Sequence, residues 1–183
     1  MSRHVGHVPV HEGRILYTSR IDPHLTFGAE VVVDIANTAL RQLETVQVLY
    51  LHRLLCVNSC SCIAPLFTET GLWPLRYRRL DLPLRYLLHI LSPSPSLFVR
   101  LAFEECTRLH STQKASWIGD LTHTLERLPV PVSLPSTNLT PDTVTHVRNN
   151  LQKAMAFSPQ TVSPTRRNLS FFNTGLNEMT RAA

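Results

Sequence analysis

The 183-residue sequence lacks both a long apolar run and a secretory leader. No run approaches the ~18 apolar residues that a membrane-spanning helix needs. Charged and polar residues interrupt the first dozen positions, so the hydrophobic centre of a signal peptide cannot form there. A mitochondrial leader is disfavoured, because Pro9 and Gly13 interrupt any amphipathic helix in that stretch. We therefore expect an intracellular protein, nuclear or cytoplasmic, with no membrane partner.

The sequence also lacks the motifs of catalytic sites. Its five aspartates include no adjacent pair, whereas a two-metal polymerase or nuclease needs clustered carboxylates to hold its ions. It contains no phosphate-binding GxxxxGK[ST] or GxGxxG loop, no HExxH zinc motif and no GxSxG nucleophile motif. These absences predict a chain that is not an enzyme and has no cofactor of its own.

Cysteine is scarce, with four residues, of which three fall within seven positions. Without a secretory leader, a disulfide framework is not expected. His52 and Cys56 have the i, i+4 spacing of two metal ligands on one helix. Cys60 and Cys62 in the following turn would complete a four-ligand zinc site. The alternative, which we favour, is a set of ordinary structural cysteines, because no second ligand pair follows after a loop.

Lysine is almost absent, since two lysines stand against sixteen arginines. The formal net charge is +5. Arginine suits phosphate through its planar fork, so RNA or DNA is a permitted partner. The alternative is codon bias in a GC-rich genome, because a charge of +5 spread along a chain is not a patch.

Apolar spacing and capping residues predict an all-α fold, an irregular bundle of about seven short helices. Asp22 and Pro23 predict the start of a helix over His24–Val33, although the three valines at its end fit a strand equally well. We expect an N-terminal arm (1–13), a helical domain (14–157) and a flexible tail (158–183). Further helices are predicted at Thr38–Leu55, Ile63–Thr70, Phe98–Leu109 and Trp117–Leu128, and from Pro74 and Pro141 onward.

The apolar stripes of two of these helices predict which face of each helix is buried. Side chains on one face of the first long helix should be buried, namely Ala39, Leu43, Val46, Tyr50 and Leu54. A second stripe is predicted after Pro141, at Val144, Val147, Leu151 and Ala154. The large aromatic residues are expected to pack in the core or at helix junctions rather than to stack on bases, namely Trp73, Phe98, Phe103 and Trp117.

The helix that Pro74 opens is predicted to be amphipathic, with leucines on one side, namely Leu80, Leu84, Leu87 and Leu91. Arg76 falls near this apolar side and should pair with Glu44 or Glu69, or extend its head to water. Pro83 removes a backbone hydrogen bond at a cost of ~3 kcal/mol, which predicts a kink or split near Asp81.

The opposite side of the same helix is basic. Arg78, Arg85 and His89 lie there, with Arg79 at the boundary. Together with Arg53 on the preceding long helix, they are candidate contacts for nucleic-acid phosphates. The alternative is a solvated helix face, which charge runs usually are.

The order of four segments resembles one family. These segments are HLTFGAEVV, LRQLETVQVLYLHRLLCVN, PLFTETGLWPLRYRRLDLPLRYLLHIL and KASWIGDLTHTLERLP. They resemble the C-terminal region of fungal non-LTR (LINE-like) retrotransposon polyproteins, downstream of the reverse transcriptase palm and thumb. The resemblance covers Arg14 to Met155. Its most specific part is an acidic residue, Thr-Gly, two residues, then Pro-hydrophobic-Arg-Tyr, matched by Glu69, Thr70, Gly71, Pro74, Leu75, Arg76 and Tyr77.

A second stretch, LETVQVLYLHRLL, fits the family's LE-x-VQ-x-x-x-L-R-R-L-L run, with His52 in place of one arginine. The resemblance implies an RNA-directed DNA polymerase that copies its RNA at a nicked chromosomal site using Mg²⁺. The family's catalytic aspartates lie upstream in the palm, so this activity does not carry over, and Met1 is expected to lie inside the polyprotein. This sequence departs from the family at two positions. Pro83 stands where the family usually has a residue that favours helix, and Cys56 stands where the family usually has a glycine that ends a helix.

The resemblance therefore implies a non-catalytic fragment that would pack behind the missing palm and thumb and help hold the template–primer duplex. The alternative function is a domesticated module that binds nucleic acid or protein.

Overall fold

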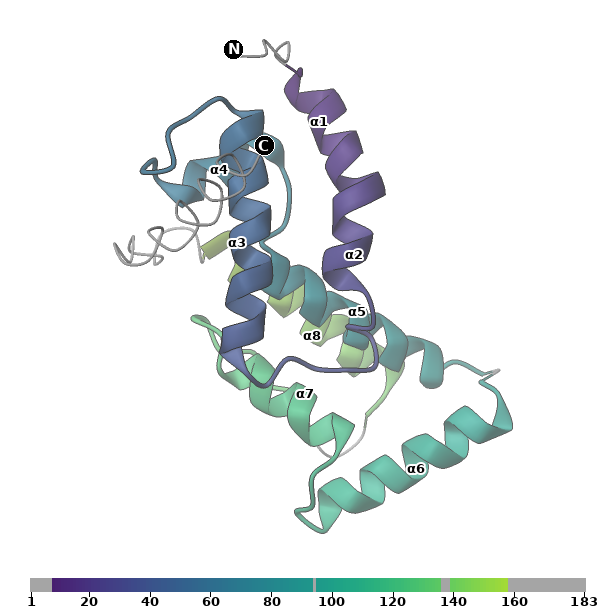
Figure 1. Cartoon of the computed structure of the whole chain (residues 1–183). Coiled ribbons are helices and arrows are strands. Elements are labelled where there is room, and N and C mark those ends of the chain that lie inside the picture. The colour runs from purple at the N-terminus through teal and green to yellow at the C-terminus, as the bar shows by residue number, and fades with distance from the viewer. Residues whose placement is uncertain (1–7, 94, 136–138, 158–183) are drawn as a thin grey trace, which may run out of the picture.

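The computed structural model describes residues 8–93, 95–135 and 139–157, and these residues form an all-α fold without strands. As predicted, about seven helical segments follow one another, the first built from three pieces joined end to end (Figure 1). The predicted tail at 158–183 lies outside the described residues. The elements are α1 (Val10–Leu16), η1 (Tyr17–Ile21), α2 (Asp22–Thr26), α3 (Asn37–Leu54), α4 (Ile63–Thr70), α5 (Leu75–Ile90), α6 (Leu97–Ser111), α7 (Trp117–Glu126) and α8 (Pro141–Phe157).

The first helical segment departs from its predicted bounds. It begins at Val10, inside the predicted arm, and ends at Thr26, whereas the prediction was a helix over His24–Val33. Asp22 does not cap a helix start, because α2 continues directly from the π-helical turn η1. Gly28, at φ +71°, redirects the chain soon after α2 in a conformation that glycine adopts easily. The three valines that follow are neither helix nor strand.

Gly13 explains why a helix is stable where Pro9 and a glycine predicted none. Its backbone lies against α3, since a Cβ placed on Gly13 would come within 2.1 Å of Leu54 Cδ1. The Tyr50 hydroxyl donates a hydrogen bond of 2.7 Å to the Gly13 carbonyl. Packing against α3 therefore overrides the weak helix propensity of this stretch.

Helices α3 and α4 lie close to their predicted bounds, and Gly71 ends α4 in the left-handed conformation at φ +62°. The buried face of α3 is rotated from the predicted one, and Val46 is 47% exposed. The first three helical pieces, α1, η1 and α2, form one continuous rod from Val10 to Thr26. The buried face of α3 differs from the predicted one because α3 contacts this α1–α2 rod, α4 and α5 from different directions. The buried side chains of α3 are Leu40, Gln47, Leu51, His52 and Leu54.

Helix α5 runs unbroken from Leu75 to Ile90, with Pro83 inside it. The predicted split is therefore wrong. Pro83 is fully buried, and its packing offsets part of the lost backbone hydrogen bond. The leucine stripe on this helix is buried as predicted at Leu80, Leu84 and Leu87.

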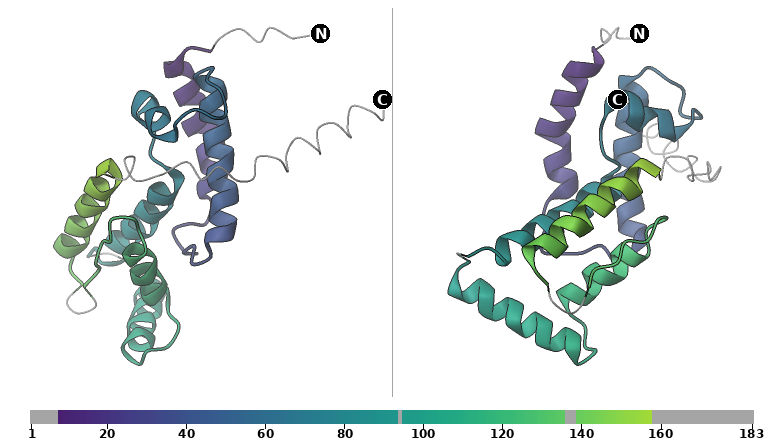
Figure 2. Two further views of the ribbon diagram at one scale, coloured as in Figure 1. Left: turned by 90° about the vertical axis from the view of Figure 1, so that its left-hand side faces the viewer. Right: turned by 180° about the vertical axis from the view of Figure 1, so that it is seen from behind.

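Two hydrophobic clusters make up the interior, and α5 belongs to both. Leu75, at the start of α5, packs with the α1–α2 rod, α3 and α4. From Tyr77 onward α5 packs against α7 and α8, and α8 runs alongside it in all views (Figures 1 and 2). The α8 stripe is buried as predicted at Val144, Val147, Leu151 and Ala154.

Helix α6 lies at the end of the molecule away from α1 and α3 and has no buried residue (Figures 1 and 2). Phe98 is 82% exposed, so the prediction that it packs in the core is wrong. The reason is that α6 packs against α7 and α5 on one side only. The other three aromatic residues pack, as predicted, against the cluster that α5 forms with α7 and α8, namely Trp73, Phe103 and Trp117.

Within the described ranges, no helix is both long enough and apolar enough to cross a membrane.

Candidate functional site

The corner between α4 and α5 is built by the motif that carries the family resemblance. The Thr70 hydroxyl donates to the Leu66 carbonyl at 2.6 Å inside α4, and Gly71 then turns the chain. Pro74 directly precedes α5, where its missing N–H leaves no donor unsatisfied. Glu69 is exposed at the end of α4. The motif therefore determines where one helix ends and the next begins.

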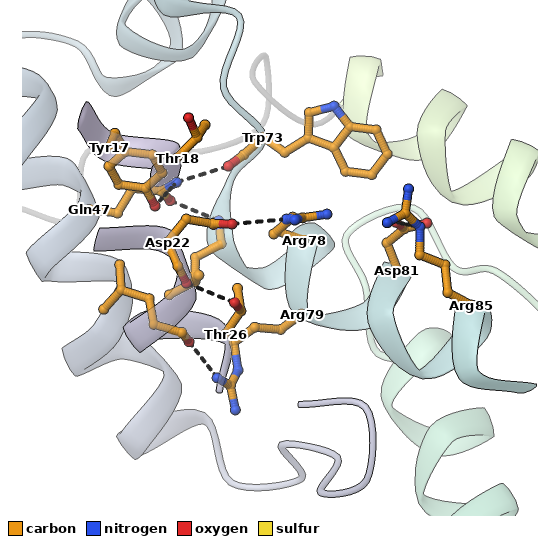
Figure 3. Close-up of polar contacts among 12 residues, drawn as sticks. Tyr17, Thr18, Asp22, Thr26, Gln47, Trp73, Arg78, Arg79, Asp81 and Arg85 are labelled. Atoms are coloured by element: carbon orange, nitrogen blue, oxygen red, sulfur yellow. Dashed lines mark hydrogen bonds and ion pairs between the residues drawn. The ribbon is translucent and has the colours of Figure 1, made fainter. Parts of the chain in front are cut away.

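The side chain of Gln47 on α3 bonds to the backbone of this corner (Figure 3). Its Nε2 donates to the Trp73 carbonyl at 2.9 Å and to the Tyr17 hydroxyl oxygen at 2.9 Å. Its Oε1 accepts from the backbone N–H of Leu75 at 2.8 Å. Gln47 is 2% exposed, so these bonds are shielded from water. Burial, with the charge of Asp22 adding to it, raises the pKa of Tyr17 well above its ordinary value.

Arg76 and Tyr77 face inward from the first turn of α5. The Arg76 Nε lies 3.2 Å from the Glu44 Oε1 on α3, so of the three alternatives that the sequence left open the structure shows the pairing with Glu44. Tyr77 is 2% exposed and belongs to the hydrophobic cluster that α5 forms with α7 and α8. Both residues hold α5 against its neighbours.

Arg78, a candidate phosphate contact, is turned toward the α1–α2 rod. Its Nε lies 3.3 Å from the Asp22 Oδ2 (Figure 3). The Asp22 carboxylate is largely buried, with 12% of its side chain exposed. A buried carboxylate needs a cation beside it, so Arg78 is held in this pairing.

Arg79 is the most enclosed of these arginines, with 10% of its side chain exposed. Its guanidinium donates through Nε and Nη2 to both oxygens of Asp34. The remaining Nη1 donates to the Leu25 carbonyl at the end of the rod. Arg79 therefore joins α5 to α2 and to the loop before α3 at the same time.

Arg85 takes part in a three-residue ion cluster with α8. One oxygen of the Asp81 carboxylate, whose side chain is 3% exposed, accepts a hydrogen bond of 2.8 Å from the Arg148 Nε–H. The other oxygen lies 3.0 Å from the Arg85 Nε in an ion pair. Arg148 was not among the predicted site residues. The signal that could have found it is the aspartate itself, because a carboxylate on the apolar side of a helix needs cationic partners.

The predicted phosphate contacts do not form one patch. His89 is exposed one turn beyond Arg85 on α5, and its ring centre lies 6.5 Å from that of Tyr86. Arg53 is exposed near the end of α3. Arg78 and Arg79 turn back toward carboxylates. Arg85 and His89 thus remain together on one exposed side, while Arg53 lies on another helix.

The four candidate zinc ligands are not brought together. His52 is buried at 6% exposure, whereas Cys56, Cys60 and Cys62 are exposed. Among the residues described, no group of three or more His, Cys, Asp or Glu side chains is arranged to hold a metal ion. Burial lowers the pKa of His52 below its ordinary value, which favours the neutral ring.

Two hollows lie beside the Arg76 and Arg79 pairings, between α3, α5 and α7. Their volumes are about 20 Å³ and 10 Å³. Spaces of this size hold about one water molecule at most. Neither hollow is therefore large enough to hold a substrate or a cofactor.

No family model, no curated protein and no solved structure matches the chain.

Proposed function

We propose that this chain is a non-catalytic helical part of a retrotransposon RNA-directed DNA polymerase, and that it at most assists in binding the template–primer duplex. It would do so beside the palm and thumb of that polymerase, where Mg²⁺ and the catalytic aspartates lie.

The meeting of the two motifs that carry the resemblance is the observation on which this proposal depends. Glu44 and Gln47 come from the LETVQ run, and they contact the GLWPLR run about thirty residues later. Glu44 pairs with Arg76, and Gln47 bonds to the backbone of Trp73 and Leu75. This contact supports the proposal, because it makes the two motifs parts of one helical unit.

The state of the aspartates supports the non-catalytic role. Asp22, Asp34 and Asp81 each pair with at least one arginine of α5. A carboxylate oxygen that a guanidinium group engages is less available to a metal ion or to a proton in general-base chemistry. The remaining two aspartates, Asp120 and Asp142, lie on the separate helices α7 and α8.

The proposal is tested by binding of the purified chain to a labelled RNA–DNA duplex over a salt series. We expect a helical circular dichroism spectrum and an affinity that falls linearly, on logarithmic scales, as salt rises. A helical spectrum without salt-dependent binding would contradict the nucleic-acid role. A spectrum without helix would mean that the chain needs its palm and thumb to fold.

A second candidate is a domesticated module that binds nucleic acid or protein. The observation that favours it is α6, where Leu97, Phe98 and Leu101 are more than half exposed. Neighbouring genomic sequence separates the two candidates. Palm motifs immediately upstream, interrupted by stop codons or frameshifts, favour the fragment, whereas an isolated and transcribed intact gene favours the module.

A further inference from the structure

The ion cluster of Asp81, Arg85 and Arg148 carries more positive charge than is needed to neutralise the buried Asp81 carboxylate. Asp81 is buried and contributes one negative charge, while two guanidinium groups converge on it from α5 and α8. One arginine would be enough to neutralise the carboxylate. The cluster therefore keeps a net charge of +1 at the seam between two helices that pack along their lengths.

The two arginines contact Asp81 in a way that leaves most of their donors available. Each guanidinium is held through its Nε atom, by a different oxygen of the same carboxylate. Within the described part of the chain, the Nη groups of Arg85 and Arg148 have no hydrogen-bond acceptor. The Arg85 side chain is 56% exposed and that of Arg148 is 22% exposed. Four Nη atoms are thus free to bind an anion.

The surroundings of this pair favour an anion over a cation. His89 stands one turn beyond Arg85 on α5 and is exposed. One turn to either side of Arg148, α8 carries no acidic residue, only Val144, Thr145, Leu151 and Gln152. Within one turn of Arg85 on α5 and within one turn of Arg148 on α8, the only carboxylate is therefore that of Asp81. Both oxygens of Asp81 already contact the two arginines.

We propose that Arg85 and Arg148, held through their Nε atoms by Asp81, form a paired contact for the phosphodiester backbone of the bound nucleic acid. The proposal rests on the proposed function and assigns its phosphate-binding site to the α5–α8 seam. Asp81 orients both planar guanidinium groups before the ligand arrives, so less side-chain freedom is lost on binding. Arginine forks oriented in this way match the oxygens of a phosphate.

The test compares single glutamine variants of the two arginines with a matched control. In Arg85→Gln or Arg148→Gln, the other arginine still neutralises Asp81, so the fold should be retained. Arg100→Gln on α6 is the control, because Arg100 is also surface-exposed (62%) and paired at i, i+4, with Glu104. Each of these three glutamine variants loses one positive charge. Circular dichroism and thermal unfolding check that each is folded.

Affinity for a labelled RNA–DNA duplex is measured over the same salt series for each protein. We expect each of the two seam variants to reduce the salt slope by roughly one unit, and the double variant by roughly two. The control should keep the slope of the unmodified chain. Arg148→Lys, which keeps the charge and can still pair with Asp81, should keep the slope but bind more weakly, because lysine lacks the fork.

The outcomes separate this inference from the proposed function. If the unmodified chain binds and the seam variants match Arg100→Gln, the duplex is held elsewhere and the inference is wrong, while the proposed function stands. If the unmodified, folded chain shows no salt-dependent binding, both are wrong. If Arg148→Gln is unfolded, Arg85→Gln and Arg148→Lys still decide the question.

Discussion

At the scale of single residues, the neighbour of each arginine on α5 decides what that arginine can do. Arg76, Arg78 and Arg79 lie within reach of carboxylates on other elements and are largely enclosed. Breaking such a pair would leave a desolvated charge without its partner. Arg85 is also paired, but more than half of its side chain is exposed. The difference is that the partner of Arg85, Asp81, lies on α5 itself, so this pairing does not enclose Arg85 between two elements.

Gln47 offers the clearest test of the corner at residue scale. Gln47→Met keeps the length of the side chain but removes its hydrogen bonds, leaving the half-buried Trp73 carbonyl and the buried Leu75 N–H without partners. We expect the free energy of unfolding to fall by about 2–3 kcal/mol. Urea unfolding followed by circular dichroism measures it. Gln42→Met, at an exposed position of the same helix, is the control and should change little.

His52 predicts a pH dependence of stability. Burial lowers its pKa in the folded chain, whereas in the unfolded chain it keeps an ordinary value of about 6.5. Below that value the unfolded chain binds a proton that the folded chain does not, so stability decreases as the pH falls. His52→Leu should reduce the loss of stability between about pH 7.5 and pH 5.5. Urea midpoints at both pH values measure it, and the exposed His123→Leu should leave the loss unchanged.

At the scale of elements, the α4–α5 corner shows how one short motif serves several helices. Gly71 ends α4, Pro74 leads into α5, and the backbone between them bonds to α3 through Gln47. The Arg14 guanidinium lies beside Gly71, close to the C-terminus of α4, where a cation is favourable. A change in the direction of this corner would therefore move α5 relative to α3.

Gly71 should be the position in this corner most sensitive to a small side chain. Its φ of +62° is strained for alanine, while the Arg14 Nη1, 3.3 Å from an added Cβ, belongs to an exposed side chain that can move. We expect Gly71→Ala to lower the free energy of unfolding by about 1–2 kcal/mol. Gly71→Asn should lose less, because asparagine tolerates the left-handed region better. Equal losses in the two variants, measured by urea unfolding, would show that contact rather than backbone strain determines the cost.

At the scale of the whole molecule, α5 joins two hydrophobic clusters into one body. Its first residue packs with the rod, α3 and α4, and its later residues pack with α7 and α8. The Arg79 contacts to Asp34 and to the Leu25 carbonyl tie the N-terminal rod and the following loop to this helix. We expect the two clusters to depend on each other through α5 and its ion pairs.

Arg79→Lys tests this link without changing the net charge. Lysine cannot contact both oxygens of Asp34 and the Leu25 carbonyl together, so stability should fall by about 1–3 kcal/mol. Arg108→Lys is the matched control, since Arg108 also binds both oxygens of a carboxylate, that of Glu105. That pair is exposed on α6, and its replacement should have no measurable effect. Urea unfolding of the two variants measures the difference, and equal effects would contradict the proposed link.

The local signals in the sequence predicted most helices for identifiable reasons. Ser116 accepts a hydrogen bond from the Gly119 N–H at the start of α7, as a capping residue should. Gly71 ends α4, and the α8 stripe is buried. These features depend on residues within one or two turns of each other, so they can be read from the chain alone. The helix start predicted at Asp22 and Pro23 was wrong, because these two residues also fit inside the rod that packs against α3.

The all-α class, most helix ends after the rod and the buried stripes of α5 and α8 could be predicted from the sequence, which left the partner of Arg76 open. The packing of the helices sets the start of the rod at Val10, the pairing of Arg76 with Glu44 and the enclosure of particular arginines of α5. It also brought Arg148 to Asp81, 67 residues earlier in the chain. Helix periodicity specifies which side of a helix is apolar, but not which distant carboxylate a side chain meets. That depends on how the helices pack, which no local pattern contains.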